Sequence, residues 1–357
     1  MTEVPMMQGV LDIPQDLERV QRLVVDSLPG VEEVFARQLD SDLPPVDQMC
    51  GYIERYRGKM LRPTLVILCG AAANADLDGL LASGSDGEIC TPAHTVCGAV
   101  CEMVHMATLV HDDVLDEAEI RRRGQTLNML KGNETSVILG DYLIASAYEL
   151  CSSLDSPVPS RIVGNASAVM CTGELLQLHH RNNRSLDEAT YIEILERKTA
   201  ALIAAACELG ALATLGFGQT DHPYATALRV FGTRLGVAFQ IQDDVLDLLG
   251  TEQTVGKSVG KDLEKGKLTH PLIHHLAHAD PGQAVRSLEL IAMASKGDGS
   301  GLGELIDAVG GTGSVEATQR LASSYVLDAK AALSAVPESS GRTMLELIAD
   351  AVISRSY

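Results

Sequence analysis

The chain has 357 residues, of which 46% are hydrophobic and only 3% aromatic, with no tryptophan. Its 28 basic and 48 acidic residues give a net charge of −20 at pH 7, which argues against nucleic acid as a partner because phosphate backbones bind basic surfaces. Ala and Leu are abundant and no Val/Ile alternation is bounded by hairpin turns, so we expect an all-α fold.

The predicted helices follow one another along a single domain. Residues 1–15 are expected to form a flexible N-terminus and residues 16–357 one helical domain. Helices are predicted over 17–36, 95–117, 135–154, 160–180, 186–215 and 224–249, and again over the last ~45 residues. Gly-rich loops are predicted over 74–93, 250–271 and 295–313. Ser185 and Glu188 have the spacing of a capping box for the helix that follows them.

The cellular location of the protein is inferred from the N-terminus, the most apolar window and the cysteines. The first residues are acidic and have no basic n-region, so no secretory signal is expected. The most apolar window, residues 200–218, contains Glu208 and much Ala and Gly, which is typical of a buried helix rather than a membrane span. The eight cysteines form no CxxC pair, which favours free thiols in a reducing, cytoplasmic setting.

One acidic pentapeptide, DDVLD, occurs twice, at Asp112–Asp116 and at Asp243–Asp247. Each copy closes a long apolar stretch with predicted helical structure. Positions i, i+1 and i+4 of a helix fall within an arc of ~100°, so the three aspartates of each copy lie on one side of the helix. The candidate carboxylates are Asp112, Asp113 and Asp116 in the first copy, and Asp243, Asp244 and Asp247 in the second.

Carboxylates gathered in this way are costly for folding. They repel one another, and they lie at the C-terminal end of a helix, where negative charge is unfavourable. A hard divalent cation such as Mg²⁺ removes the cost and bridges carboxylates to phosphate oxygens. A single copy could be a solvated acidic helix end, but two copies in the same context predict a metal site.

Basic residues cluster near both acidic motifs. Arg121, Arg122 and Arg123 follow the first copy, and His105 lies on the same helical stripe as Asp112. Upstream, Lys59 and Arg62 have i, i+3 spacing. The other candidates are Lys198, which with Thr199 interrupts an apolar helix, and the lysines of the loop VGKSVGKDLEKGK: Lys257, Lys261, Lys265 and Lys267. In so acidic a chain these clusters predict an anionic ligand.

Together these motifs resemble those of the trans-type, head-to-tail polyprenyl diphosphate synthases, over roughly residues 20–357. Residues 57–63 are similar to the family's GGKRLRP box with two positions replaced, and 198–200 match its KTA. FQIQDD is found at 239–244, and the family's GKxxGxDLxxGKxTxP is matched over 256–271. The resemblance implies an isoprenoid-synthase helical bundle with a central active-site cavity, acting as a homodimer.

The resemblance also implies a role for each matching residue. Asp112, Asp116 and Asp243 would bind Mg²⁺ directly, and Asp113, Asp244 and Asp247 would bind it or support the ligands; three Mg²⁺ ions are expected, with Mn²⁺ as a substitute. Arg121, Lys198 and Lys257 would contact an allylic diphosphate, and Lys59, Arg62, His105 and Arg122 would hold isopentenyl diphosphate. Lys267 would also bind substrate, and Thr199 and Gln240 would face the reacting carbons, with Lys198 beside them.

The implied reaction is ionisation of the allylic diphosphate, condensation with isopentenyl diphosphate and elimination of a proton. The tail would extend past Ala107, Thr108 and Val104, none of them aromatic, so nothing in this stretch would stop it after a few carbons. We therefore expect a C30 to C50 all-trans product, with a C20 geranylgeranyl product as the alternative. The deeper floor would come from the helix of Tyr142 and Tyr148.

Two other classes of protein remain as alternatives. A class I terpene cyclase shares the first acidic motif, but it carries a different second metal motif and an aromatic-lined pocket. A non-catalytic subunit of a heteromeric synthase tends to lose aspartates or basic residues, whereas this chain has both sets. Since the product is apolar, transient membrane contact on product release is also expected.

Overall fold

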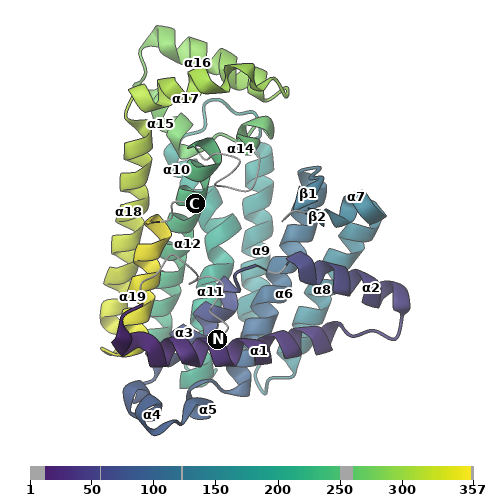
Figure 1. Ribbon diagram of the computed structural model, residues 1–357, viewed down its shortest axis with the longest axis vertical. Coiled ribbons are helices and arrows are strands. Elements are labelled where there is room, and N and C mark those ends of the chain that lie inside the picture. Colours follow the sequence, from purple (N-terminus) through teal and green to yellow (C-terminus); the bar gives the residue numbers. More distant parts are fainter. Residues whose placement is uncertain (1–12, 57, 122–123, 250–259, 355–357) are drawn as a thin grey trace. The chain divides into compact units, whose positions relative to one another are not determined.

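The structure, a computed structural model, describes residues 13–56, 58–121, 124–249 and 260–354. The predicted all-α fold is confirmed: within these ranges the elements are helices, apart from one antiparallel pair of two-residue strands, β1 (Ile120–Arg121) and β2 (Gly124–Gln125) (Figure 1). Most of the predicted flexible N-terminus lies outside the described residues.

The chain forms two compact units. The first comprises Met1–Ser167, Leu202–Gly232 and Ala332–Ile348, and the second comprises Ala168–Ala201, Thr233–Ala331 and Ala349–Tyr357. Three of the boundaries fall inside the helices α9 (Val158–His179), α12 (Pro223–Leu249) and α19 (Ser340–Ile353). A single domain over residues 16–357 stays a prediction.

The first unit is built around α6 (Pro92–Leu115), which packs along α8 (Asn133–Ser152) and is crossed by α1 (Glu18–Leu39) (Figure 1). Next to α6 lies α3 (Leu61–Ala73), whose LVILCGAAA run is apolar on all sides and buried. The other elements are η1 (Gln15–Leu17), α2 (Pro44–Ile53), η2 (Glu54–Tyr56), α4 (Leu77–Ser83), α5 (Asp86–Ile89), α7 (Leu127–Lys131), α11 (Ala201–Leu215), and the first parts of α9 and α12.

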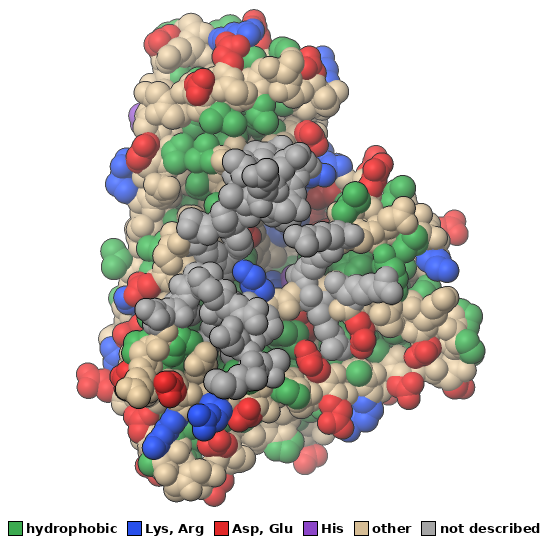
Figure 2. Space-filling view, viewed as in Figure 1, with side chains coloured by type: hydrophobic (Ala, Val, Ile, Leu, Met, Phe, Trp, Pro, Cys, Tyr) green, Lys and Arg blue, Asp and Glu red, His purple; other side chains and the backbone are tan. Residues whose placement is uncertain are grey.

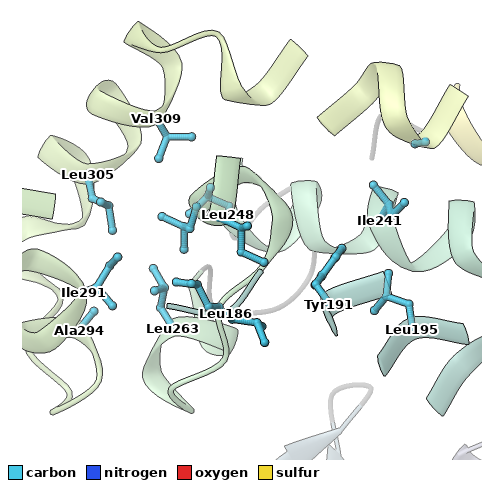
Figure 3. Packing of buried hydrophobic residues seen from close by; sticks show 14 of the residues in the cluster. Leu186, Tyr191, Leu195, Ile241, Leu248, Leu263, Ile291, Ala294, Leu305 and Val309 are labelled. Atoms are coloured by element: carbon cyan, nitrogen blue, oxygen red, sulfur yellow. The ribbon is translucent and has the colours of Figure 1, made fainter. Parts of the chain in front are cut away.

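The second unit is built around the C-terminal half of α12 and α10 (Glu188–Leu195), which leads into η3 (Glu196–Ala200), a single π-helical turn. Its core is a cluster of buried apolar residues that includes Leu195, Ile241 and Leu248 (Figure 3). The other elements are α14 (Lys261–Glu264), α15 (His270–His278), α16 (Pro281–Ala294), η4 (Gly299–Gly301), α17 (Leu302–Gly311), α18 (Ser314–Ala332), η5 (Leu333–Ala335) and the end of α19.

Two of the predicted loops were wrong in part. The segment 74–93 contains α4 and α5, and the segment 295–313 contains α17. Both α4 and α17 bury apolar residues four positions apart, Leu77 with Leu81 and Leu305 with Val309. Tertiary burial therefore outweighs the poor helix propensity of the surrounding Gly and Ser.

The predicted helix over 186–215 is interrupted. Asp187, not Ser185, caps α10, with its Oδ1 accepting a hydrogen bond from the Thr190 amide at 2.7 Å. The stretch is then broken by the π turn η3 before α11 begins. A π turn inside a helix is typical of functional sites.

Among the described residues, two helical stretches are long and apolar enough to cross a membrane, Pro92–Leu115 and Glu188–Leu215; a bent pair, Leu61–Ala73 with Leu77–Ser83, would make a third. In the first two, 67% and 61% of the apolar window is buried inside the protein, as expected of core helices. All eight cysteines are free thiols, and six of them are buried. Acidic side chains are spread over the face drawn in Figure 2, in keeping with the net charge of −20.

Candidate active site

The first acidic motif ends α6, as predicted. The helix begins with a capping box between Thr91 and His94 and ends at Leu115, so Asp116 is its C-cap. The three carboxylates differ in burial. Asp113 is only 1% exposed, whereas Asp112 and Asp116 are half-buried.

Asp113 is engaged by the protein itself. Its Oδ1 accepts hydrogen bonds from Arg121 Nε at 2.9 Å and Nη2 at 2.8 Å. The Arg121 guanidinium carbon lies 6.0 Å from the centre of the Tyr56 ring, and the Tyr56 hydroxyl accepts a hydrogen bond from the Leu127 amide at 2.8 Å. Burial, and next the charge of Asp113, raise the pKa of Tyr56, although the Leu127 bond opposes them. Arg121 therefore ties the strand β1 to the buried aspartate.

The predicted isopentenyl diphosphate ligands of this unit begin at α3. Lys59 is exposed and precedes Met60, whose left-handed φ of 50° starts the helix, and Arg62 lies in its first turn. The N-terminal end of a helix favours anions because its amides are unpaired and its dipole is positive. Arg62 Nε is buried, and none of the described residues gives it a hydrogen-bond partner. Burial lowers the pKa of Arg62, and the charge of the buried Glu102 on α6 opposes that shift.

The remaining predicted ligands of this group are partly described. His105 is half-buried on α6, one turn beyond Glu102. Arg122 lies outside the described residues, as do Arg123 and Lys257, the latter a predicted ligand of the allylic diphosphate.

The second acidic motif lies near the end of α12 and repeats the burial pattern of the first. Asp244 is 5% exposed, whereas Asp243 and Asp247 are half-buried. The second aspartate of each motif thus faces the protein interior, and the first and fifth retain exposed surface.

A chain of hydrogen bonds runs through Asp244. Tyr191 Oη donates to its Oδ2 at 2.7 Å, and Gln240 Nε2 donates to its Oδ1 at 2.8 Å. Thr199 Oγ1 in turn donates to Gln240 Oε1 at 3.1 Å. Burial, and then the charge of Asp262, raise the pKa of Asp244, and the hydrogen bonds from Gln240 and Tyr191 oppose the rise. The structure therefore brings Thr199 and Gln240 into direct contact.

Lys198 lies in the π turn and is held by α9. Its Nζ pairs with the Glu174 carboxylate and donates to Gln177 Oε1 at 2.9 Å. The α9 helix lies so close to the backbone of the π turn that Gly173 has no room for a side chain. If Gly173 were alanine, its Cβ would lie 2.6 Å from the Lys198 amide nitrogen. This close approach places Lys198 and Thr199.

The described part of the lysine-rich loop is attached to the second motif. Asp247 Oδ2 accepts a hydrogen bond from the Asp262 amide at 3.1 Å, and the Asp247 carbonyl accepts one from Gly260 at 2.8 Å. Lys267 Nζ lies 4.0 Å from Asp262 Oδ1. Asp262 thus links Lys267 to the end of α12.

The predicted chain-length residues lie on α6. Val104 and Ala107 are 1% and 0% exposed, and Thr108 is half-buried. Thr108 Oγ1 donates to the His105 carbonyl at 2.7 Å, so its hydroxyl is used within the helix. Tyr142 and Tyr148, which were predicted to form the floor of the tail tunnel, are half-buried on α8. Tyr148 packs against Gly164, since a Cβ added to Gly164 would lie 3.3 Å from the Tyr148 hydroxyl.

The donor chemistry of both motifs fits a hard divalent cation. Each unit offers a pair of half-buried carboxylates, Asp112 with Asp116 and Asp243 with Asp247. Within the described ranges, no three His, Cys, Asp or Glu side chains converge in a way that could hold an ion on their own. Ligands for Mg²⁺ from each motif would therefore have to be completed by water or phosphate oxygens, which Mg²⁺ readily accepts.

Several residues that contact the predicted site residues of each unit were missed by the sequence analysis. They are Tyr56 and Glu102 in the first unit, and Glu174, Gln177 and Tyr191 in the second. Asp262 belonged to a matched motif but was given no role. Tyr191 had a signal, because it lies on the same helical stripe as Lys198, about two turns earlier. Glu174 and Gln177 have i, i+3 spacing, but nothing in the sequence connects α9 with Lys198.

Known proteins are similar over nearly the whole chain. The polyprenyl synthetase family profile matches residues 44–306. The chain is 33% identical to octaprenyl diphosphate synthase of Escherichia coli over 342 residues, 95% of this chain and 99% of that protein. It is 30% identical to heptaprenyl diphosphate synthase component 2 of Geobacillus stearothermophilus, over 96% of this chain and 99% of that one.

A solved structure is similar as well. A polyprenyl synthase from Caulobacter crescentus, complexed with calcium and isoprenyl diphosphate, superimposes with a TM-score of 0.83 at 32% identity, covering 96% of this chain and 99% of that one. The fold is that of an all-helical isoprenoid synthase. The chain belongs to the polyprenyl synthetase family.

Proposed function

We propose that the chain is a trans-prenyltransferase that condenses isopentenyl diphosphate with an allylic diphosphate into a long all-trans polyprenyl diphosphate, C30 to C50. The observation that carries the proposal is the full-length similarity to octaprenyl diphosphate synthase. The burial pattern of the two acidic motifs supports it, since each leaves its first and fifth aspartates accessible to a metal.

The metal would be Mg²⁺, with three ions in all and Mn²⁺ as a substitute. The ligands would be Asp112, Asp116, Asp243 and Asp247. Asp113 and Asp244 would support these ligands. When bound, the ions neutralise charge on the departing diphosphate. Arg121, Lys198 and Lys257 bind the allylic diphosphate in this proposal, and Lys267 also binds substrate. Lys59, Arg62, His105 and Arg122 bind the second diphosphate, so that two polyanions are held in reacting position.

Chain length is proposed from α6. Ala107 and Val104 are buried small or aliphatic side chains, and Thr108 directs its hydroxyl to its own helix. A growing apolar tail therefore meets methyl groups rather than an aromatic ring along this stretch. This favours a long product over the C20 alternative.

A homodimer in the cytoplasm, with transient membrane contact for product release, is proposed with this activity. Apolar side chains stay exposed on the first unit around α7 and α8, among them Ile120 at 69% and Ile138 at 67%. Such a patch is typical of a protein–protein interface. The eight free thiols are consistent with a reducing compartment.

The test is product chromatography. The purified chain alone, with Mg²⁺, farnesyl diphosphate and radiolabelled isopentenyl diphosphate, should give dephosphorylated products of C30 or longer. A C20 product would select the geranylgeranyl alternative. Absence of any product from the chain alone, regained on adding a partner subunit, would select the non-catalytic subunit of a heteromeric synthase.

A further inference from the structure

Tyr191 has a well-defined position that the proposed reaction does not yet use. It is 3% exposed in α10, and its ring packs in the apolar cluster with Leu195 and Ile241 (Figure 3). The centre of the His270 ring lies 5.9 Å from the centre of the Tyr191 ring. With the ring enclosed on these sides, the hydroxyl has little freedom, and it donates to Asp244 Oδ2 at 2.7 Å.

The other oxygen of Asp244 determines how Gln240 is oriented. Gln240 turns its NH₂ group toward Asp244, and its Nε2 donates to Asp244 Oδ1 at 2.8 Å. Its carbonyl oxygen then faces the other way, where Thr199 Oγ1 donates to it at 3.1 Å. The direction of the Gln240 dipole therefore depends on Asp244 staying in place.

We propose that Tyr191 is a positioning residue, whose hydroxyl fixes Asp244 so that Asp244 fixes the Gln240 amide against Thr199. The inference rests on the proposed function and on the expectation from the sequence that Thr199 and Gln240 face the reacting carbons. In this arrangement Asp244 serves mainly as an anchor for Gln240, and the half-buried Asp243 and Asp247 face the metal.

The kinetic test uses a double-mutant cycle. Tyr191→Phe removes one hydroxyl and keeps the ring, and kcat should fall about ten-fold with KM for isopentenyl diphosphate unchanged. In a Gln240→Ala background the same change should alter kcat by less than about two-fold, because the group it acts through is gone. Effects that multiply independently would overturn the proposal. Tyr325→Phe, a half-buried tyrosine beside Arg234 in the same unit, is the matched control and should keep wild-type kcat.

A second measurement needs neither metal nor substrate. In protein labelled with ¹⁵N-glutamine, the side-chain signal of Gln240 is identified by its loss in Gln240→Ala. It should shift and exchange faster with water in Tyr191→Phe, but not in Tyr325→Phe. An unmoved signal in Tyr191→Phe would overturn the proposal.

If Tyr191→Phe does not fold, Asp244→Asn takes its place. Asparagine carries an NH₂ group in place of one carboxylate oxygen, so Tyr191 and Gln240 can no longer each donate to an oxygen of their own, and the Gln240 signal should move. An unchanged signal would again overturn the proposal. Because the amide signal is measured without turnover, a wild-type chain that makes no prenyl product refutes the proposed function and leaves this result standing.

Discussion

At the scale of single residues, the six aspartates of the two motifs separate into two kinds. Helical geometry predicts that the three members of each motif share a side and does not distinguish them. The family resemblance alone set Asp113, Asp244 and Asp247 apart, as residues that bind the metal or support its ligands. In the structure Asp113 and Asp244 turn inward to protein donors, Arg121 for the first and Tyr191 with Gln240 for the second. These donors come from distant segments, so the distinction depends on tertiary structure.

The half-buried aspartates should carry the metal chemistry. We expect Asp112→Ala and Asp243→Ala each to lower kcat by about 10³-fold or more, because each removes an oxygen ligand where diphosphate charge develops. The measurement is turnover over a Mg²⁺ titration. Asp307→Ala, an exposed aspartate of α17, is the control and should be unaffected. Undiminished turnover in both site variants would refute the metal assignment.

His94 should make the stability of the protein depend on pH. Its Nδ1 accepts from the Thr91 amide at 3.1 Å, so its Nε2 carries the proton and lies 3.0 Å from Thr214 Oγ1. Burial lowers the pKa of His94 from 6.5 to about 4. Since the unfolded chain binds this proton more readily, stabilisation is complete above pH 6.5 and is lost as the pH falls toward 4.

The pH effect can be measured by urea unfolding between pH 7 and pH 4. Over that range His94 should account for up to about 3 kcal/mol of the loss in unfolding free energy. In His94→Gln, which keeps a donor and an acceptor but does not titrate, the decline should be smaller by that amount. Equal declines in the two proteins would show that His94 is not responsible.

At the scale of elements, the long helices could be predicted and their interruptions could not. Apolar periodicity located α6, α8 and α12 to within a few residues of their observed ends. The π turn η3 was not foreseen, because it lies where Gly173 lets α9 approach the Lys198 backbone, a contact between segments distant in sequence. Likewise α17 forms from a Gly-rich stretch because Leu305 and Val309 are buried.

A glycine contact joins α3 and α11 in the first unit. A Cβ on Gly210 would lie 2.2 Å from the Val66 carbonyl oxygen, and backbone atoms cannot yield as side chains do. We expect Gly210→Ala to lower the free energy of unfolding by about 3 kcal/mol, measured by urea denaturation. At Gly51 in α2 a Cβ meets nothing within 4 Å, so Gly51→Ala should be neutral or stabilising. Equal effects at the two positions would contradict the close approach.

Product length should respond to one position of α6. Ala107 is fully buried and lies in the stretch that the proposed function assigns to the tail, so a Phe there would fill space beside the tail. We expect Ala107→Phe to shorten the product, as seen by chromatography of dephosphorylated products. Ala107→Ser, which barely changes the volume, should leave the distribution unchanged. Wild-type product lengths from a folded Ala107→Phe protein would place the tail elsewhere.

At the scale of the whole molecule, the proposed homodimer can be located. If the exposed apolar patch of the first unit is the interface, Ile138→Asp should shift the protein from dimer to monomer in sedimentation velocity, because it buries a charge. Leu327→Asp changes a side chain of similar exposure, 66%, on α18 of the second unit and should leave the dimer intact. A dimer that survives Ile138→Asp would place the interface on another face.

The way the chain passes back and forth between its two units affects how it can be made. Each unit is assembled from three separated segments, and the first is complete only with Ala332–Ile348. Neither can be excised as one continuous piece. During translation, the apolar surface of the first unit that its last segment covers stays open to solvent until nearly the whole chain has been made. This protein should therefore depend on chaperones more than a protein whose domains are completed one after another.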